Sequence, residues 1–112
     1  MLFVDFYGSA EVFRATMAGI QAHVAAAFRT PPANVVVRRI VAESDYPGVE
    51  VWIELSSEEQ LYRYGGRLAA EISAVIRAAA PVDVWVLFRL VPLAHAFLNG
   101  TPRRRDASPL DE

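Results

Sequence analysis

Three arginines in the first half of the chain have clear binding chemistry. Arg29 precedes a valine-rich segment, and Arg38 and Arg39 lie near its end. A guanidinium can hold a carboxylate through two parallel hydrogen bonds, so we predict that these three side chains bind the carboxylate of a substrate. The alternative is that they form ion pairs between subunits with Glu50, Glu54 or Asp5.

Two carboxylates on one alternating segment form a second candidate site. Glu50 and Glu54 project from the same side of this segment, which would place an acid and a base together. We include Glu50 among the candidate substrate-binding residues. The alternative is that both carboxylates form salt bridges with Arg38 or Arg89.

Tryptophan side chains are a third candidate feature. Trp85, with Trp52, could form the wall of a ligand pocket, so Trp85 also belongs to the predicted substrate-binding set. The alternative is that both indole rings pack against another subunit.

The composition excludes several classes of function. The chain has no Cys, and all 11 basic residues are Arg, so thiolate and lysine chemistry are absent. His23 and His95 lack the spacing of a metal site, and no Gly-rich phosphate loop is present, so we expect no metal and no cofactor. The net charge of −2 gives no attraction to nucleic acid. We read Arg103–Arg105 as a solvated basic run, with contact to an anionic partner as the alternative.

No segment has the length and hydropathy of a membrane span, and the first residues lack the pattern of a signal peptide. We therefore expect a cytoplasmic protein that does not contact membranes.

Hydrophobic periodicity predicts two similar strand–helix–strand units, offset by about 49 residues. The predicted strands are 2–7, 34–41, 49–55 and 82–90. One helix starts at Ser9, and the other has a capping box formed by Ser57 and Gln60. The fold class is α+β: a four-stranded mixed sheet with both helices on one face. We assign residues 1–100 to a single domain and residues 101–112 to a polar tail.

The sheet face away from the helices should combine aromatic and ionisable side chains. Alternation places on it Phe3, Asp5, Tyr7, Glu50, Trp52, Glu54, Asp83, Trp85, Leu87 and Arg89. Such a face is too apolar for water and too charged for a dry core, so we expect further copies of the chain to cover it. This reasoning predicts a homo-oligomer.

The β-α-β-β-α-β order of the predicted elements, together with several short motifs, resembles the tautomerase superfamily. This superfamily includes 4-oxalocrotonate tautomerase and macrophage migration inhibitory factor. The segment 30–35 (Thr-Pro-Pro-Ala-Asn-Val) is similar to a helix-to-strand turn of the inhibitory-factor class. Segments 46–51 and 92–100 resemble a small branch with a domain of unknown function. The resemblance implies a homotrimer with inward-facing sheets. It also implies a site at subunit boundaries, where an N-terminal proline amine acts as general base or acid in keto–enol tautomerisation.

This sequence departs from the family pattern at position 2, where Leu2 replaces the proline. We expect Met1 to be retained, which displaces the terminal amine by about 3.3 Å along the strand. The Met1 amine is the candidate catalytic base, and an inert terminus is the alternative. We predict a tautomerase-fold protein with weak, altered or absent keto–enol isomerase activity on a small carboxylate. The alternatives are a non-catalytic ligand-binding or structural oligomer, and a ferredoxin-like dimeric barrel.

Overall fold

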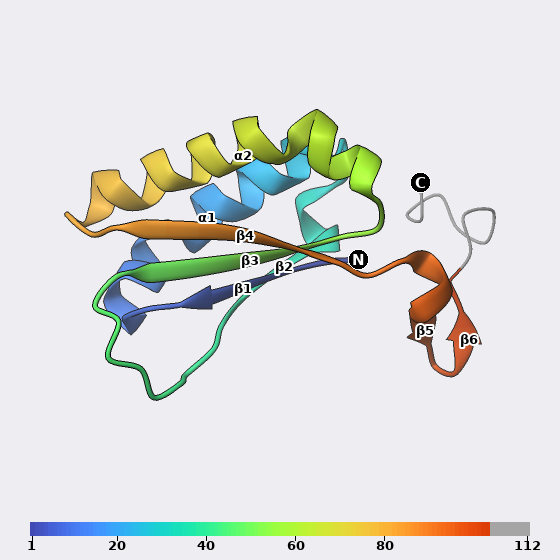
Figure 1. Cartoon of the computed structure of the whole chain (residues 1–112), viewed down its shortest axis with the longest axis horizontal. Helices are drawn as coiled ribbons and strands as arrows, with labels where there is room; N and C mark the ends of the chain where they lie inside the picture. The colour runs from blue at the N-terminus through green and yellow to red at the C-terminus, as the bar shows by residue number, and fades with distance from the viewer. Residues whose placement is uncertain (104–112) are drawn as a thin grey trace.

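The computed structural model describes residues 1–103, which form a four-stranded sheet, two long helices on one side of it and a small hairpin (Figure 1). The first unit comprises β1 (Leu2–Tyr7), α1 (Ala10–Ala27), the single turn η1 (Pro32–Asn34) and β2 (Val35–Arg39). The second unit comprises β3 (Val49–Leu55), α2 (Glu58–Ala79) and β4 (Val84–Leu90). The turn η2 (Leu93–His95) and strands β5 (Phe97–Leu98) and β6 (Thr101–Pro102) follow.

The strand order is β2-β1-β3-β4. Strands β1 and β2 are parallel, β3 and β4 are parallel, and β1 and β3 pair antiparallel in the centre. Each strand–helix–strand unit therefore pairs its own two strands, and the predicted α+β class with both helices on one face is confirmed. A ferredoxin-like sheet would place a strand of the other unit between them, so this order does not match that alternative.

Helix α1 begins where the sequence predicts, but the centre of its buried face differs from the prediction. The Ser9 hydroxyl accepts a hydrogen bond from the backbone N–H of Val12 (3.2 Å) and caps the helix. The periodicity predicts a buried stripe of Phe13, Met17, Ile20, Val24 and Phe28. Met17 is instead 43% exposed, and Thr16 occupies the buried position. Burial of Thr16 is tolerated because its hydroxyl donates to the carbonyl of Val12 (2.7 Å).

Helix α2 contains two adjacent glycines with different surroundings. A β-carbon at Gly65 would lie 2.9 Å from Leu61 Cδ1 and 3.5 Å from the ring of Phe88, whereas one at Gly66 would meet nothing within 4 Å. Gly65 therefore lets α2 approach the side chain of Phe88 on β4. Nothing in residues 1–103 explains the glycine at position 66.

Two strands are shorter than predicted. The η1 turn extends to Asn34, and the last hydrogen bond beside β2 runs from Ile40 N–H to the Phe6 carbonyl (2.8 Å). Strand β4 starts at Val84 rather than at residue 82, because Val82 N–H bonds to the Ala80 carbonyl (2.9 Å) in a tight turn. In both cases a local turn takes backbone groups that the hydrophobic pattern assigns to a strand.

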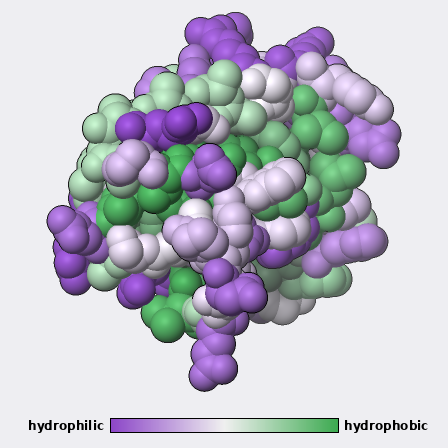
Figure 2. Space-filling view, turned by 60° about the vertical axis from the view of Figure 1, so that its left-hand side comes forward, coloured by the Kyte–Doolittle hydropathy of each residue, from purple (hydrophilic) through white to green (hydrophobic). Residues whose placement is uncertain are grey.

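The two faces of the sheet have the predicted sidedness. Val4, Phe6, Val51 and Ile53 are fully buried beneath the helices. On the other face, which we call the open face, Trp85 is 60% exposed. Figure 2 shows hydrophobic residues lying in patches between polar ones on the surface of the molecule. The tryptophans therefore do not belong to the core of a single chain.

The hairpin of β5 and β6 was not predicted. Asn99 and Gly100 link its strands with φ angles of 52° and 78°, the left-handed pair that a type I′ turn requires. The hairpin extends past the end of the sheet (Figure 1) and includes residues 101–102, which the sequence assigns to the tail. Residues 104–112 of that tail, including Arg104 and Arg105, lie outside the described residues.

Candidate functional site

A pocket of about 510 Å³ lies at the end of the sheet where β1 begins and β3 and β4 end. Its walls come from the start of β1, the turn after α1, the end of β3 and the C-terminal hairpin. This arrangement follows from the topology, since the antiparallel pairing of β1 and β3 brings the start of one strand beside the end of the other. A site here is assembled from both halves of the chain.

Phenylalanine rings from three separate elements line this pocket. Phe28 follows α1, and its ring meets Tyr64 edge-on with 5.3 Å between ring centroids. Phe3 lies on β1, and the guanidinium carbon of Arg38 is 4.7 Å from the centre of its ring. Phe97 on β5 is 61% exposed. Two aromatic walls are thus held by protein contacts, while the third presents much of its surface to solvent.

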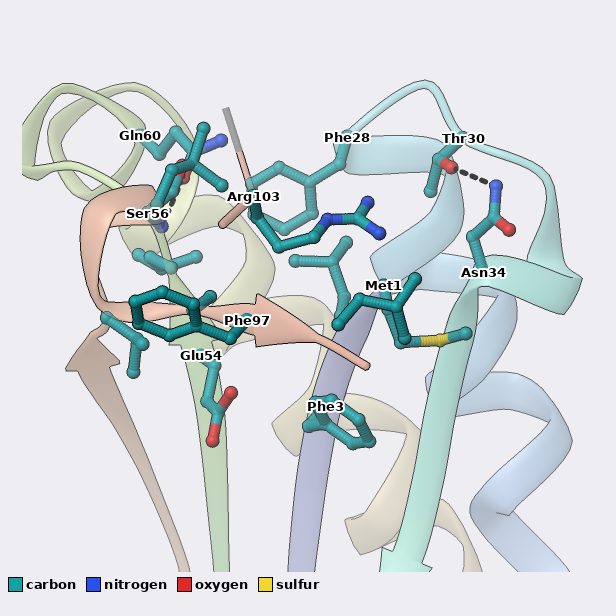
Figure 3. Close-up of a pocket in the computed structure, with 16 residues that line it drawn as sticks. Met1, Phe3, Phe28, Thr30, Asn34, Glu54, Ser56, Gln60, Phe97 and Arg103 are labelled. Carbon is teal, nitrogen blue, oxygen red and sulfur yellow. Dashed lines mark hydrogen bonds between the residues drawn. The ribbon is translucent and has the colours of Figure 1, made fainter. Parts of the chain in front are cut away.

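Most neutral polar side chains of the pocket bond to one another. Asn34 Nδ2 donates to Thr30 Oγ1 (3.0 Å), and Ser56 Oγ donates to Gln60 Oε1 (2.9 Å), as the dashed lines in Figure 3 mark. The Gln60 oxygen also accepts from the backbone N–H of Ser56 (2.8 Å). These bonds shape the turn after α1 and the start of α2.

The charged side chains of the pocket are Glu54 and Arg103 among residues 1–103. Glu54 Oε1 lies 3.8 Å from Nη1 of Arg89, which is on the adjacent strand. Arg103 comes from the end of the hairpin, and Figure 3 shows its guanidinium extending toward Met1. The pocket therefore combines an apolar wall with one guanidinium and one carboxylate.

Met1 is the predicted site residue that borders this pocket. It is 55% exposed and lies beside Leu2 and Phe3, which also line the pocket (Figure 3). Strand β1 therefore brings the candidate base to a cavity large enough for a small molecule.

Two of the predicted arginines contact other groups. Arg38 Nε lies 2.5 Å from Asp5 Oδ1 on the open face, and this hydrogen bond raises the pKa of Arg38, with the charge of Asp5 adding to the effect. Arg39 Nε donates to the carbonyl of Gly8 (2.9 Å). Neither side chain lines the pocket.

The other predicted binding residues do not line the pocket beside Met1 either. Arg29 follows Phe28 in the left-handed conformation (φ 51°) but does not line the pocket. Glu50 Oε1 accepts a hydrogen bond from Trp52 Nε1 (3.2 Å). Trp85 borders a smaller pocket of about 320 Å³ at the opposite end of the sheet, with Arg77 and Asp83. The structure thus does not bring the predicted set together.

Sequence reasoning missed Phe28, Phe97 and Arg103 as pocket residues. Phe28 had been assigned to the buried stripe of a helix, and the other two to the region around the tail. The dipeptide Asn99-Gly100 between short apolar segments was a usable signal for the hairpin. No local pattern indicates that this hairpin would lie beside β1.

Within residues 1–103, no three His, Asp or Glu side chains gather closely enough to hold a metal ion. His23 Nδ1 lies 3.4 Å from Glu71 Oε1 on the outer side of the helices. No helix in the described part of the chain has the length and hydropathy needed to cross a bilayer.

Solved structures with the same fold are numerous although their sequences differ widely from this one. A domain of unknown function from Sebaldella termitidis superposes with a TM-score of 0.73 at 14% identity, covering 91% of this chain and 99% of that one. A macrophage migration inhibitory factor-like protein from Entamoeba histolytica gives a TM-score of 0.72 at 7% identity, covering 90% and 97%. A fused 4-OT asymmetric trimer gives 0.68 at 16% identity, covering 90% and 95%.

No protein-family model matches the chain, and no curated protein does so either. The structural matches establish the fold: this chain has the tautomerase fold, as the resemblance implied, and its structural neighbours include a domain of unknown function. At these identities the likeness concerns fold, so the activity has to be argued from the pocket.

Proposed function

We propose that this tautomerase-fold chain forms a homo-oligomer whose pocket binds a small keto–enol carboxylate and isomerises it weakly. The observation that carries the proposal is the position of the pocket at the start of β1, with Met1 and Leu2 in its wall. In the family that the sequence resembles, the catalytic proline stands at this point of the fold. A cavity of about 510 Å³ there has room for a small organic acid.

The weakness of the activity follows from position 2. Leu2 replaces the proline, so a Met1 terminus would carry a primary amine about 3.3 Å further along the strand direction. A general base has to lie within hydrogen-bonding reach of the proton that it removes. A displacement of one residue therefore reduces proton transfer even where the ligand still binds.

The open face supports the oligomeric part of the proposal. Asp5 is 6% exposed and lies between Arg38 and Arg89, while Trp85 on the same face is 60% exposed. An exposed indole beside a nearly buried carboxylate favours coverage by another protein surface. The fused 4-OT structure is described as an asymmetric trimer, so we propose three copies.

Light scattering coupled to size exclusion tests the assembly. We expect three times the chain mass of 12.4 kDa. A protein that stays monomeric at micromolar concentration would contradict our account of the open face.

The isomerase activity is tested with phenylenolpyruvate, whose ketonisation is followed by absorbance. We expect a rate slightly above buffer for the native protein. The Leu2→Pro variant, with loss of Met1 verified by intact mass, should be about tenfold faster or more because its terminal amine is a secondary one. Leu2→Ile is the matched control, because it changes the same side chain and keeps Met1.

A non-catalytic binding protein is the second candidate, and the leucine at position 2 favours it. If neither the native protein nor Leu2→Pro exceeds the buffer rate, the proposal of isomerase activity is wrong. Binding of a carboxylate in the absence of turnover would then identify the chain as a binding protein.

A further inference from the structure

The C-terminal hairpin is attached to the body of the protein at the pocket. Val91 N–H donates to the Leu55 carbonyl at 2.7 Å, which extends the pairing of β4 with β3. After the turn at Asn99 and Gly100, the chain returns, and Arg103 N–H donates to the Ala96 carbonyl at 2.8 Å. These two bonds place the backbone of Arg103 beside the same wall as Ala96 and Phe97.

The hairpin presents apolar side chains that its own chain covers incompletely. Phe97 is 61% exposed and Leu98 is 55% exposed, and both line the pocket. Phe3 and Phe28 contribute aromatic surface from other elements (Figure 3). An apolar ligand in this space would remove water from rings on several walls at once, which favours its binding.

Arg103 adds a positive charge to this apolar pocket. The three arginines that the sequence singled out, Arg29, Arg38 and Arg39, do not line the pocket. A guanidinium suits a carboxylate because its parallel N–H groups match the two oxygens. The guanidinium that lines the pocket therefore comes from the hairpin and not from the sheet.

Glu54 limits the ligand to a single anionic group. Its carboxylate lines the same pocket, and its Oε1 lies 3.8 Å from Nη1 of Arg89 on the open face. A second carboxylate on the ligand would therefore approach a negative charge, and like charges in a partly enclosed site repel. A ligand with one carboxylate and an apolar body fits both the rings and the charges.

We propose that Arg103 is the carboxylate-binding residue of this pocket and that the hairpin selects aromatic or branched monocarboxylates over neutral compounds and dicarboxylates. The proposal rests on the proposed function in that it concerns the same pocket. It does not depend on turnover, because a measurement of ligand binding is enough to test it.

The test measures binding of three probes by isothermal titration calorimetry, using full-length protein. The probes are 3-phenylpropionate, its neutral amide 3-phenylpropanamide and the dicarboxylate 2-phenylsuccinate. We expect the native protein to bind 3-phenylpropionate at least about tenfold more tightly than either other probe. Arg103→Gln should weaken binding of the acid by about 10- to 100-fold and leave binding of the amide unchanged, because a charge-assisted hydrogen bond is lost.

Two further variants separate charge from apolar contact. Phe97→Ala should weaken the binding of the acid and the binding of the amide by similar factors. Arg14→Gln also removes one positive charge, but from the exposed side of α1, far in sequence from the hairpin. It should change the affinity for neither probe. Unfolding midpoints of all variants verify that each is folded.

Native affinity for the acid that persists in a folded Arg103→Gln variant would overturn this inference and leave the pocket and the proposed function intact. Failure of the native protein to bind any of the probes, and to turn over phenylenolpyruvate, would overturn the proposed function itself. Equal affinity of the native protein for the acid and the amide would also overturn the role of Arg103.

Discussion

At one end of the sheet the start of β1 borders the large pocket, whereas at the other end the residues before β3 are packed against their neighbours. The strand pairing at the two ends is equivalent, since Leu2 pairs with Val35 and Val49 pairs with Val84. Met1 and Gly48 therefore occupy corresponding places before the two central strands. The difference between the ends comes from what surrounds these two residues.

The end at Gly48 is closed by the loop that leads into β3. A β-carbon at Gly48 would lie 2.6 Å from the Asp83 carbonyl oxygen and 2.5 Å from the Tyr46 hydroxyl. The Asp83 carbonyl accepts the N–H of Val49 at 2.9 Å. The glycine thus allows the loop to pack directly against the start of β3. At the other end, Met1, Arg103 and the hairpin surround an open space.

This contrast shows that the repeated strand–helix–strand frame does not itself create the pocket. The residues that precede each central strand, and the segment added after β4, decide whether the larger pocket forms beside the start of that strand. Substitutions at the closed end should therefore act on stability, and equivalent substitutions at the open end should not.

The largest expected effect is at Gly48. Gly48→Ala should lower the free energy of unfolding by about 1–3 kcal/mol, because the new methyl group overlaps a backbone oxygen that cannot rotate away. Urea unfolding followed by circular dichroism measures the change. The matched control is Ala96→Val at the open end, where the extended backbone (φ −113°, ψ 134°) suits a β-branched residue and the expected change is within about 0.5 kcal/mol. Equal losses for both variants would show that the two ends do not differ.

A smaller effect, of opposite sign, is expected at Tyr46. Its hydroxyl oxygen is buried and has no hydrogen-bond partner within residues 1–103. Tyr46→Phe removes this group and should stabilise the protein by about 1 kcal/mol, because a buried polar atom without a partner loses its hydration. Thermal unfolding of the variant measures the change. A loss of stability would mean that the hydroxyl has a partner in solution, and the closed end would then be more polar than its packing indicates.

The smallest effect is expected between the two ends, at the ion pair of Arg38 with Asp5. The Arg38 side chain is 46% exposed, so solvent screens the pair and Arg38→Gln should cost about 0.2–1 kcal/mol. The hydrogen bond to Asp5 raises the pKa of Arg38 further above its already high ordinary value. Stability from a raised pKa is present below the unfolded-state pKa and is lost only as the pH rises through the folded-state pKa.

The cost of Arg38→Gln should therefore be the same at pH 6 and at pH 9. Paired urea titrations of the native and variant proteins measure it at both values. A cost that changes between them would mean that another titrating group controls the pair.

The sequence by itself determined the frame of this protein. Alternation in Val49–Leu55 predicted which side chains of β3 face the helices, since successive residues of a strand point to opposite sides. Capping residues Ser9 and Ser57 predicted the starts of both helices, since a hydroxyl before the first turn satisfies an N–H that the helix leaves unpaired. Turns limited this accuracy at residues 34 and 82, where local hydrogen bonds to Pro31 and Ala80 make both strands start later than predicted.

Only the tertiary structure decided the composition of the pocket. Phe3, Phe28 and Arg103 lie far apart in the sequence, and their meeting depends on antiparallel pairing of β1 with β3 and on the return of the hairpin. Arg38 showed the same limit, because the sequence offered Glu50, Glu54 and Asp5 as partners from another subunit. The register of β1 against β2 places it beside Asp5 of the same chain. Periodicity reports the side of an element on which a residue lies, while the identity of its neighbours depends on long-range packing, which no local pattern encodes.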